Sequence, residues 1–189
     1  MFVDGARDLK RHPSLEVFSR DHNVGLVMSR RLIEASSSDD IFRETVNRQF
    51  FDYWRDELAD HLQKEERLLT PVIQGADMLE RLIREHQELA EAVTRLREQP
   101  DNGELTLLVG KLISHHIRWE ERCLFPEIER SISPSQLRDL AEQTDELERL
   151  RSGSIWSPRR GELVKRRQNN QVCTPDSLDG NHEVNIPNT

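Results

Sequence analysis

Apolar residues recur at intervals of three and four over four long segments of the chain, which is the period of an amphipathic helix. The first predicted helix covers about residues 15–35, and the second begins after Asp39 and runs to about residue 70. The third covers about residues 77–98 and the fourth about residues 104–124. Each segment carries one apolar stripe, so the pattern predicts helices that pack around a shared core.

Turn-forming and helix-capping residues separate these segments. Proline and glycine follow the second and third helices, and Pro126 is expected to end the fourth. Ser133, Pro134 and Gln136 then form the pattern of a helix start, with Ser133 as the cap and Gln136 completing a capping box. This pattern predicts a shorter fifth helix that reaches about residue 150.

The connections between the four long helices are short, so sequential neighbours are expected to run antiparallel. The predicted fold class is therefore all-α: an up-down-up-down antiparallel four-helix bundle with an additional short C-terminal helix. The bundle is predicted over residues 14–151, after an N-terminal extension over residues 1–13. Residues 152–189 are rich in Ser, Pro, Gly, Asn and Gln without an apolar period, which predicts a mostly disordered tail.

Composition agrees with a helical domain and excludes several classes of partner. Charged residues make up 33% of the chain and aromatic residues 5%, a balance that favours helices over a β-sandwich or barrel. The formal net charge of −8 argues against a nucleic-acid-binding protein. No segment approaches the roughly 18 consecutive apolar residues of a membrane span, and the first thirty residues hold no signal-peptide core. With two cysteines, too few for a disulfide framework, we expect a cytoplasmic protein without a membrane partner.

The chain contains an internal repeat. Residues 61–73 read HLQKEERLLTPVI and residues 116–128 read HIRWEERCLFPEI, identical at seven of thirteen positions. The other two long helices correspond more weakly, and His22 aligns with His86. The bundle is therefore interpreted as two helical hairpins, each with one histidine on its first helix and a His-x3-Glu pair on its second.

The repeat predicts a metal centre inside the bundle. Residues four apart lie on one helical face, so each His-x3-Glu pair can address a single point. Two divalent cations bridged by the two glutamates would satisfy all six polar groups, whereas buried carboxylates without partners would be very costly. Imidazole and carboxylate donors suit Fe, Mn or Zn, and the lack of a cysteine donor argues against a structural thiolate zinc site. The candidate metal ligands are His22, His61, Glu65, His86, His116 and Glu120.

The sequence allows alternatives to several of these assignments. His115 lies five residues before Glu120 and competes with His116, although the repeat favours His116. The alternative to a metal centre is a metal-free bundle in which neutral His and Glu side chains pair with each other. Several neighbouring carboxylates are expected either to orient an imidazole or to lie at the surface: Asp21, Asp60, Glu66, Glu85 and Glu121. Cys123, Trp119 and Phe125 are interpreted as packing residues.

The spacing and the paired segments resemble the hemerythrin-like family with its H…HxxxE…H…HxxxE cation-binding domain, over residues 14 to about 130. The resemblance implies a non-haem di-iron centre held by the six residues above, with Glu65 and Glu120 as bridges. It also implies chemistry with O2, NO or peroxide. The oxygen carriers of this family have a second histidine where this chain has Ala90, so redox turnover or NO binding is favoured over reversible O2 carriage.

The leading functional hypothesis is a non-haem di-iron protein that binds or transforms a small oxidant, O2, NO or H2O2, with Mn or Zn as alternative metals. No residue stands out as a dedicated general acid or base, so an oxidoreductase activity on peroxide or NO would depend on the metals. The alternative is an iron-, oxygen- or NO-responsive sensor or signalling module without catalytic turnover. The sequence indicates no particular protein partner.

Overall fold

The computed structural model describes residues 11–150, and every regular element in this part of the chain is a helix. The elements are α1 (Pro13–Ser36), α2 (Asp40–Tyr53), η1 (Trp54–Leu58), α3 (Ala59–Leu69), α4 (Ala76–Glu98), α5 (Gly103–Trp119), η2 (Glu120–Leu124), α6 (Phe125–Ser131) and α7 (Pro134–Leu150). Among the described helices, none combines the length and the apolar composition that crossing a membrane requires. The predicted tail at 152–189 lies outside the described residues.

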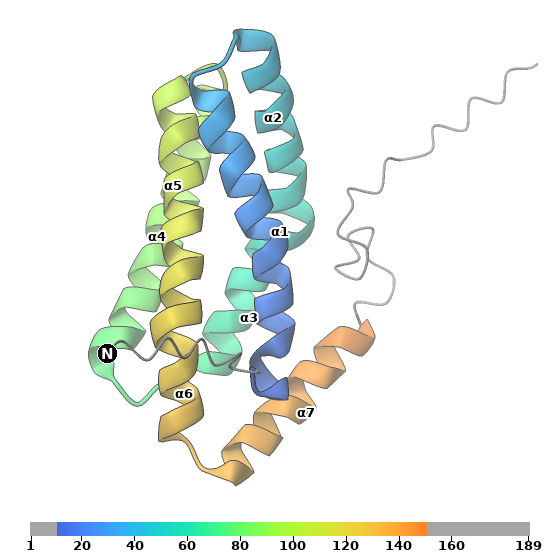
Figure 1. Ribbon diagram of the computed structural model, residues 1–189, viewed down its shortest axis with the longest axis vertical. Helices are drawn as coiled ribbons and strands as arrows, with labels where there is room; N and C mark the ends of the chain where they lie inside the picture. Colours follow the sequence, from blue (N-terminus) through green and yellow to red (C-terminus); the bar gives the residue numbers. More distant parts are fainter. Residues whose placement is uncertain (1–10, 151–189) are drawn as a thin grey trace, which may run out of the picture.

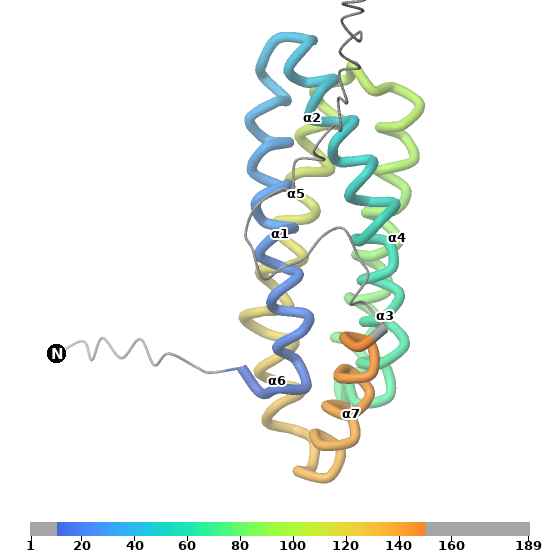
Figure 2. Tube along the Cα trace, turned by 90° about the vertical axis from the view of Figure 1, so that its right-hand side faces the viewer, coloured from blue at the N-terminus to red at the C-terminus, as the bar shows by residue number. Residues whose placement is uncertain are grey.

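Four long helices stand side by side in the bundle, and α7 crosses one end of it (Figure 1). We refer to the four as the bundle helices: α1, the continuous helix α2–η1–α3, α4, and the continuous helix α5–η2–α6. The colour gradient shows that sequential bundle helices run in opposite directions (Figure 2). The predicted all-α helical bundle with an additional C-terminal helix is confirmed.

Two bundle helices contain a π-helical turn, which sequence periodicity did not reveal. In η2 the backbone N–H of Phe125 donates to the carbonyl of Glu120, five residues back. The helix then continues through Pro126 to Ser131, so the prediction that this proline ends the helix was wrong. Proline is tolerated there because it occupies the first turn of the segment that follows the π-turn. The interpretation of Cys123 as a buried packing residue was also wrong, since η2 leaves it exposed.

Side-chain caps define the helix starts. The capping box predicted for the fifth helix is present: Gln136 N–H donates to Ser133 Oγ at 3.3 Å, and Ser133 N–H donates to Gln136 Oε1 at 2.9 Å. Side-chain atoms also accept from the first turns of three other helices, and the capping residues are His12, Asp39 and Asn102. A cap of this kind stabilises a helix by about 1 kcal/mol.

Close contact between α1 and α5 depends on a glycine. A Cβ atom at Gly110 would lie 3.0 Å from the carbonyl oxygen of Ser29 and 2.9 Å from Cγ1 of Ile33. The Ser29 hydroxyl also donates to the carbonyl of Gly110 at 2.7 Å, although the two residues are 81 positions apart. Absence of a side chain at this position thus sets how closely the first and last bundle helices approach.

The apolar core is divided into two clusters. One contains Met28, Phe50, Leu62, Leu89, Val109 and Ile117, among others. The other contains Phe18, Leu69, Leu82, Trp119, Phe125 and Leu140, and α7 packs its Leu137 and Leu147 against it. Along each bundle helix, the candidate ligands lie between residues of the two clusters. The packing of apolar side chains, worth about 1.5–3 kcal/mol for each fully buried one, therefore encloses a polar layer from both sides.

Candidate metal centre

Six histidine and glutamate side chains occupy this polar layer, and all four bundle helices contribute to it. They are His22 on α1, His61 and Glu65 on α3, His86 on α4, His116 on α5 and Glu120 at the start of η2. None of the six is more than 4% exposed, and both glutamates are 0% exposed. The fold thus brings together the six residues that the repeat and the helical spacing single out.

The six side chains form two groups of potential metal donors, and within each group the donor atoms lie within 4.8 Å of one another. The first group consists of His22, His61 and Glu65, and the second of Glu65, His86, His116 and Glu120. Glu65 belongs to both, because Oε1 is 3.0 Å from His61 Nε2 while Oε2 is 3.6 Å from His86 Nε2. Glu120 Oε2 lies 3.1 Å from His22 Nε2 and 3.3 Å from His116 Nε2. Each carboxylate therefore faces histidines of both groups, as a bridging ligand would.

The two buried glutamates lack hydrogen-bond partners. Neither oxygen of Glu65 and neither oxygen of Glu120 has one within the described part of the chain, and the same holds for His22 Nε2. A carboxylate removed from water without a hydrogen bond is strongly disfavoured, so such groups in proteins are paired or bind cations. The donor set of four imidazoles and two carboxylates fits metal cations in this layer.

A second layer of carboxylates surrounds the histidines. Each Nδ1 atom faces a carboxylate oxygen at 2.7–3.1 Å, and each carboxylate comes from a different bundle helix than its histidine. The pairs are Asp21 with His61, Glu66 with His86, Glu85 with His116, and Glu121 with His22. Followed in chain order, each bundle helix supplies a carboxylate to the next, and the last supplies one to the first. The four pairs form a closed ring around the bundle.

This ring orients the imidazoles. In a neutral imidazole that donates its Nδ1–H to a carboxylate, Nε2 keeps its lone pair and presents it to the centre. From the sequence, these carboxylates are expected either to orient an imidazole or to lie at the surface. The structure places Asp21 and Glu85 behind histidines of other helices, not behind the ligand candidates that follow them in sequence. Asp60 instead pairs with Lys64 at the surface, where its side chain is 58% exposed.

The electrostatics of the layer favour cations. Burial raises the pKa of Glu65, but His61 and His22 outweigh burial and hold the pKa well below its usual range. Burial also raises the pKa of Glu85, yet hydrogen bonds from His116 and Arg81 lower it to about 2. Burial lowers the pKa of His61, whereas Glu65 and Asp21 raise it to about 9. Glu65 and Glu85 therefore remain charged at neutral pH, and Glu65 and Asp21 favour a positive charge at His61.

A comparison with protein-family models identifies the family of this chain. The model for the hemerythrin HHE cation binding domain matches residues 13–114, more than half of the chain. The chain belongs to this family. The match includes His22, His61, Glu65 and His86 and ends just before His116, so the fold and the repeat, not the match, associate His116 with the others. A search of curated proteins and a search of solved structures found no match.

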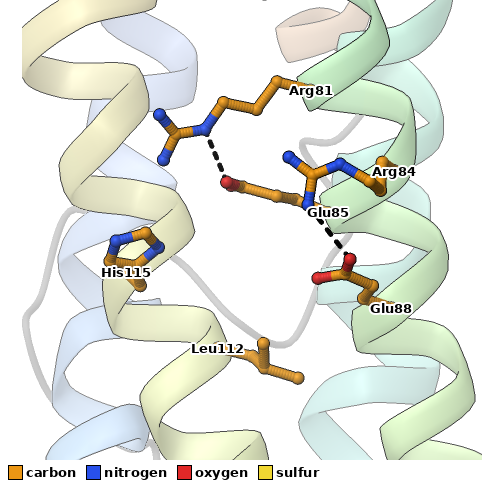
Figure 3. Close-up of a pocket in the computed structure, with 6 residues that line it drawn as sticks. All are labelled: Arg81, Arg84, Glu85, Glu88, Leu112 and His115. Atoms are coloured by element: carbon orange, nitrogen blue, oxygen red, sulfur yellow. Dashed lines mark hydrogen bonds and ion pairs between the residues drawn. The ribbon is translucent and has the colours of Figure 1, made fainter.

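In this hemerythrin-family chain the two adjacent histidines of α5 lie on different sides of the helix. His116 is 4% exposed and faces the polar layer. His115 is exposed and lines a cleft of about 270 Å³ between α4 and α5, together with Arg81, Arg84, Glu85, Glu88 and Leu112 (Figure 3). Glu85 connects this cleft to the centre, because it accepts from Arg81 Nε at 2.6 Å and from His116 Nδ1 at 3.0 Å.

Aromatic rings cover the centre on the side of α7. Phe125 stacks on the imidazole of His22, with ring centroids 5.5 Å apart and an interplanar angle of 9°. Phe18 meets His61 edge to face at 5.8 Å, and Trp119 lies 6.2 Å from His116. The sequence interpreted Phe125 and Trp119 as packing residues, and both also form walls of the centre.

Proposed function

We propose that this centre holds two iron ions, one bound by His22 and His61 and the other by His86 and His116, with Glu65 and Glu120 between them. The observation that carries the proposal is the pair of buried glutamates whose four oxygens have no hydrogen-bond partner in the described residues, although both oxygens of Glu65 and Oε2 of Glu120 face histidine nitrogens. Family membership supports cation binding. Oxygen and nitrogen donors without sulfur suit iron, with Mn or Zn as the alternatives.

We further propose that the centre binds or transforms a small oxidant, namely O2, NO or H2O2. About four protein donors for each ion would leave coordination positions for an external ligand, and iron supplies redox chemistry at these positions. The protein contributes apolar borders on two sides of the layer, formed by the two core clusters and three aromatic rings. These borders limit the access of bulk water and favour a small ligand.

The donor count favours turnover or NO binding over reversible O2 carriage. The centre has four histidines, and Ala90, which stands where the resembled carriers have a further histidine, is exposed. One nitrogen donor fewer makes a lasting O2 adduct less favourable. We therefore expect iron-loaded protein to consume H2O2 or bind NO more readily than it stores O2.

The experiment that tests this function starts with protein purified without added metal and then loaded with Fe²⁺ under anaerobic conditions. Elemental analysis should give about two ions per chain, and addition of NO or H2O2 should produce new visible absorption bands. His115→Ala serves as a matched control for His116→Ala. Equal metal content in the two variants would contradict the proposed centre, and a spectrum that neither NO, H2O2 nor subsequent exposure to O2 changes would contradict the proposed reactivity.

A sensor without turnover is the second candidate function. The centre joins all four bundle helices, so ion or ligand occupancy is coupled to the stability of the whole bundle. Ligand binding that changes melting temperature or proteolytic susceptibility without consuming the oxidant would favour the sensor over the enzyme.

A further inference from the structure

The residues just before α1 are attached to a distant part of the chain. The guanidinium of Arg11 donates to Oε2 of Glu121 at 2.8 Å, to the backbone carbonyl of Glu121 at 2.9 Å, and to Oε2 of Glu129 at 3.3 Å. The backbone N–H of His12 donates to Glu129 Oε1 at 2.8 Å. These contacts join the start of α1 to η2 and α6, more than 100 positions later in the chain. We call them the N-terminal strap.

The strap meets the metal centre at one histidine. Glu121, held by Arg11 through one oxygen, accepts from His22 Nδ1 through the other at 2.7 Å. Phe125 lies between the same two residues: the Arg11 guanidinium is 5.3 Å from its ring centroid, and the ring stacks on His22. Arg11 thus contacts both residues that hold the edge and the face of the His22 imidazole. The Arg11 side chain is 16% exposed.

The other half of the centre is supported differently. His116 is oriented by Glu85, whose arginine partner Arg81 stands four residues earlier on the same helix. The Arg81–Glu85 pair is local to α4, because residues four apart on a helix are neighbours. The support of His22 requires two chain segments remote in sequence to be in place. The two halves of the centre therefore differ in what must remain folded for the histidine to keep its orientation.

We propose that Arg11 is a positioning residue for His22 and that the N-terminal strap retains the cation of the His22–His61–Glu65 group. For that cation to leave, His22 must turn away from it, and the strap opposes this rotation through Glu121 and Phe125. The inference rests on the proposed pair of cations, but not on iron or on a reaction with an oxidant. Loss of the strap weakens one half of the centre selectively.

The test uses full-length protein loaded with Zn²⁺ and then exposed to excess chelator, with release of both ions followed over time. Arg11→Gln should release one ion about tenfold faster than wild type, the lower end of the loss in metal affinity that follows removal of a partner behind a metal ligand, and the second ion at the wild-type rate. Arg130→Gln is the matched control, because Arg130 also pairs with a glutamate of α6 but its side chain is 75% exposed. It should release both ions as wild type does.

Imidazole NMR signals identify which ion leaves. In Arg11→Gln the signals of His22 and His61 should change to their metal-free positions first, while those of His86 and His116 persist. Glu129→Gln, which removes the other anchor of the strap, should show the same order with a smaller effect, and it replaces Arg11→Gln if that variant fails to fold.

Unchanged release of both ions, or equal acceleration of both, would overturn the role of Arg11. A wild-type chain that binds no pair of Zn²⁺ ions would overturn the centre itself, and a centre that binds Zn²⁺ but reacts with no oxidant would leave this inference standing.

Discussion

The Nε2 atoms of His86 and His116 lie 3.1 Å apart, although the two residues are on different helices and 30 positions apart in the chain. Both Nδ1 atoms already face carboxylates, Glu66 for His86 and Glu85 for His116. Two lone pairs at this distance repel each other unless a proton or a cation lies between them. The oxygens of Glu65 and Glu120 that face histidine nitrogens also need a proton or a cation between the two atoms. This arrangement favours the binding of cations by the folded chain.

Replacement of the two adjacent histidines, His115 and His116, tests which of them binds metal. His116→Ala should remove the cation of the second donor group and lower the melting temperature of metal-loaded protein, because it deletes a buried donor. His115→Ala changes an exposed side chain and should leave metal content and melting temperature near the wild-type values. Elemental analysis and thermal unfolding of the two loaded variants check this. A larger loss of metal in His115→Ala would reverse the assignment.

Removal of metal should destabilise the protein. A ligand at 1,000 times its dissociation constant contributes about 4 kcal/mol to the folded state, which corresponds to a shift in melting temperature of about 10 °C for a chain of this size. Calorimetry with and without chelator measures the shift, and readdition of Zn²⁺ or Fe²⁺ should reverse it. A melting temperature independent of chelator would show that the buried carboxylates are satisfied without a cation.

Stability of the metal-free protein should fall in acid. The pKa of Glu85 and that of Glu121 are each held at about 2, below the usual value of 4.5. Burial raises the pKa of Glu121, but the interactions with His22, Ser19 and Arg11 outweigh burial and lower the pKa. A carboxyl group whose pKa is lowered by folding contributes stability above pH 4.5, and this contribution is lost as pH falls toward 2. Urea unfolding of metal-free protein across this range should show the loss.

Two variants test the source of that acid dependence. Glu85→Gln and Glu121→Gln should each reduce the slope of the unfolding free energy between pH 4.5 and 2, since glutamine does not titrate. Glu88→Gln is the control, because Glu88 forms an exposed pair with Arg84. An equal reduction of the slope in all three variants would mean that the overall charge of the protein, and not the four histidine–carboxylate pairs, governs the loss of stability in acid.

Substitution of Gly110 tests the close approach of α1 and α5. Gly110→Ala should destabilise the bundle by about 1–3 kcal/mol, because the new methyl group would push against the Ser29 carbonyl and Ile33. Gly75→Ala is the control, since a Cβ there meets its nearest neighbour, Met78, at 3.8 Å. Chemical unfolding of both variants gives the difference. Equal stability of the two would show that the helices move apart at little cost.

Much of this organisation follows from local spacing. Helical periodicity predicts the bundle helices, and the two HxxxEExxLxP segments place each His-x3-Glu pair on one face of its own helix. These relationships are local, because residues four apart on a helix are neighbours whatever surrounds them. The repeat favours His116 over His115 for the same local reason: His116, like His61, lies four residues before a glutamate.

Contacts between helices required the tertiary structure. Asp21 and Glu85 each precede a candidate ligand, yet they hold His61 and His116 on other helices, because consecutive residues point about 100° apart around a helix. Which carboxylate meets which imidazole depends on the rotation and axial offset of the helices, and contacts such as Gly110 against Ser29 set these. The strap from Arg11 to Glu121 has the same origin, because it joins residues 110 positions apart in the chain, which no local pattern encodes.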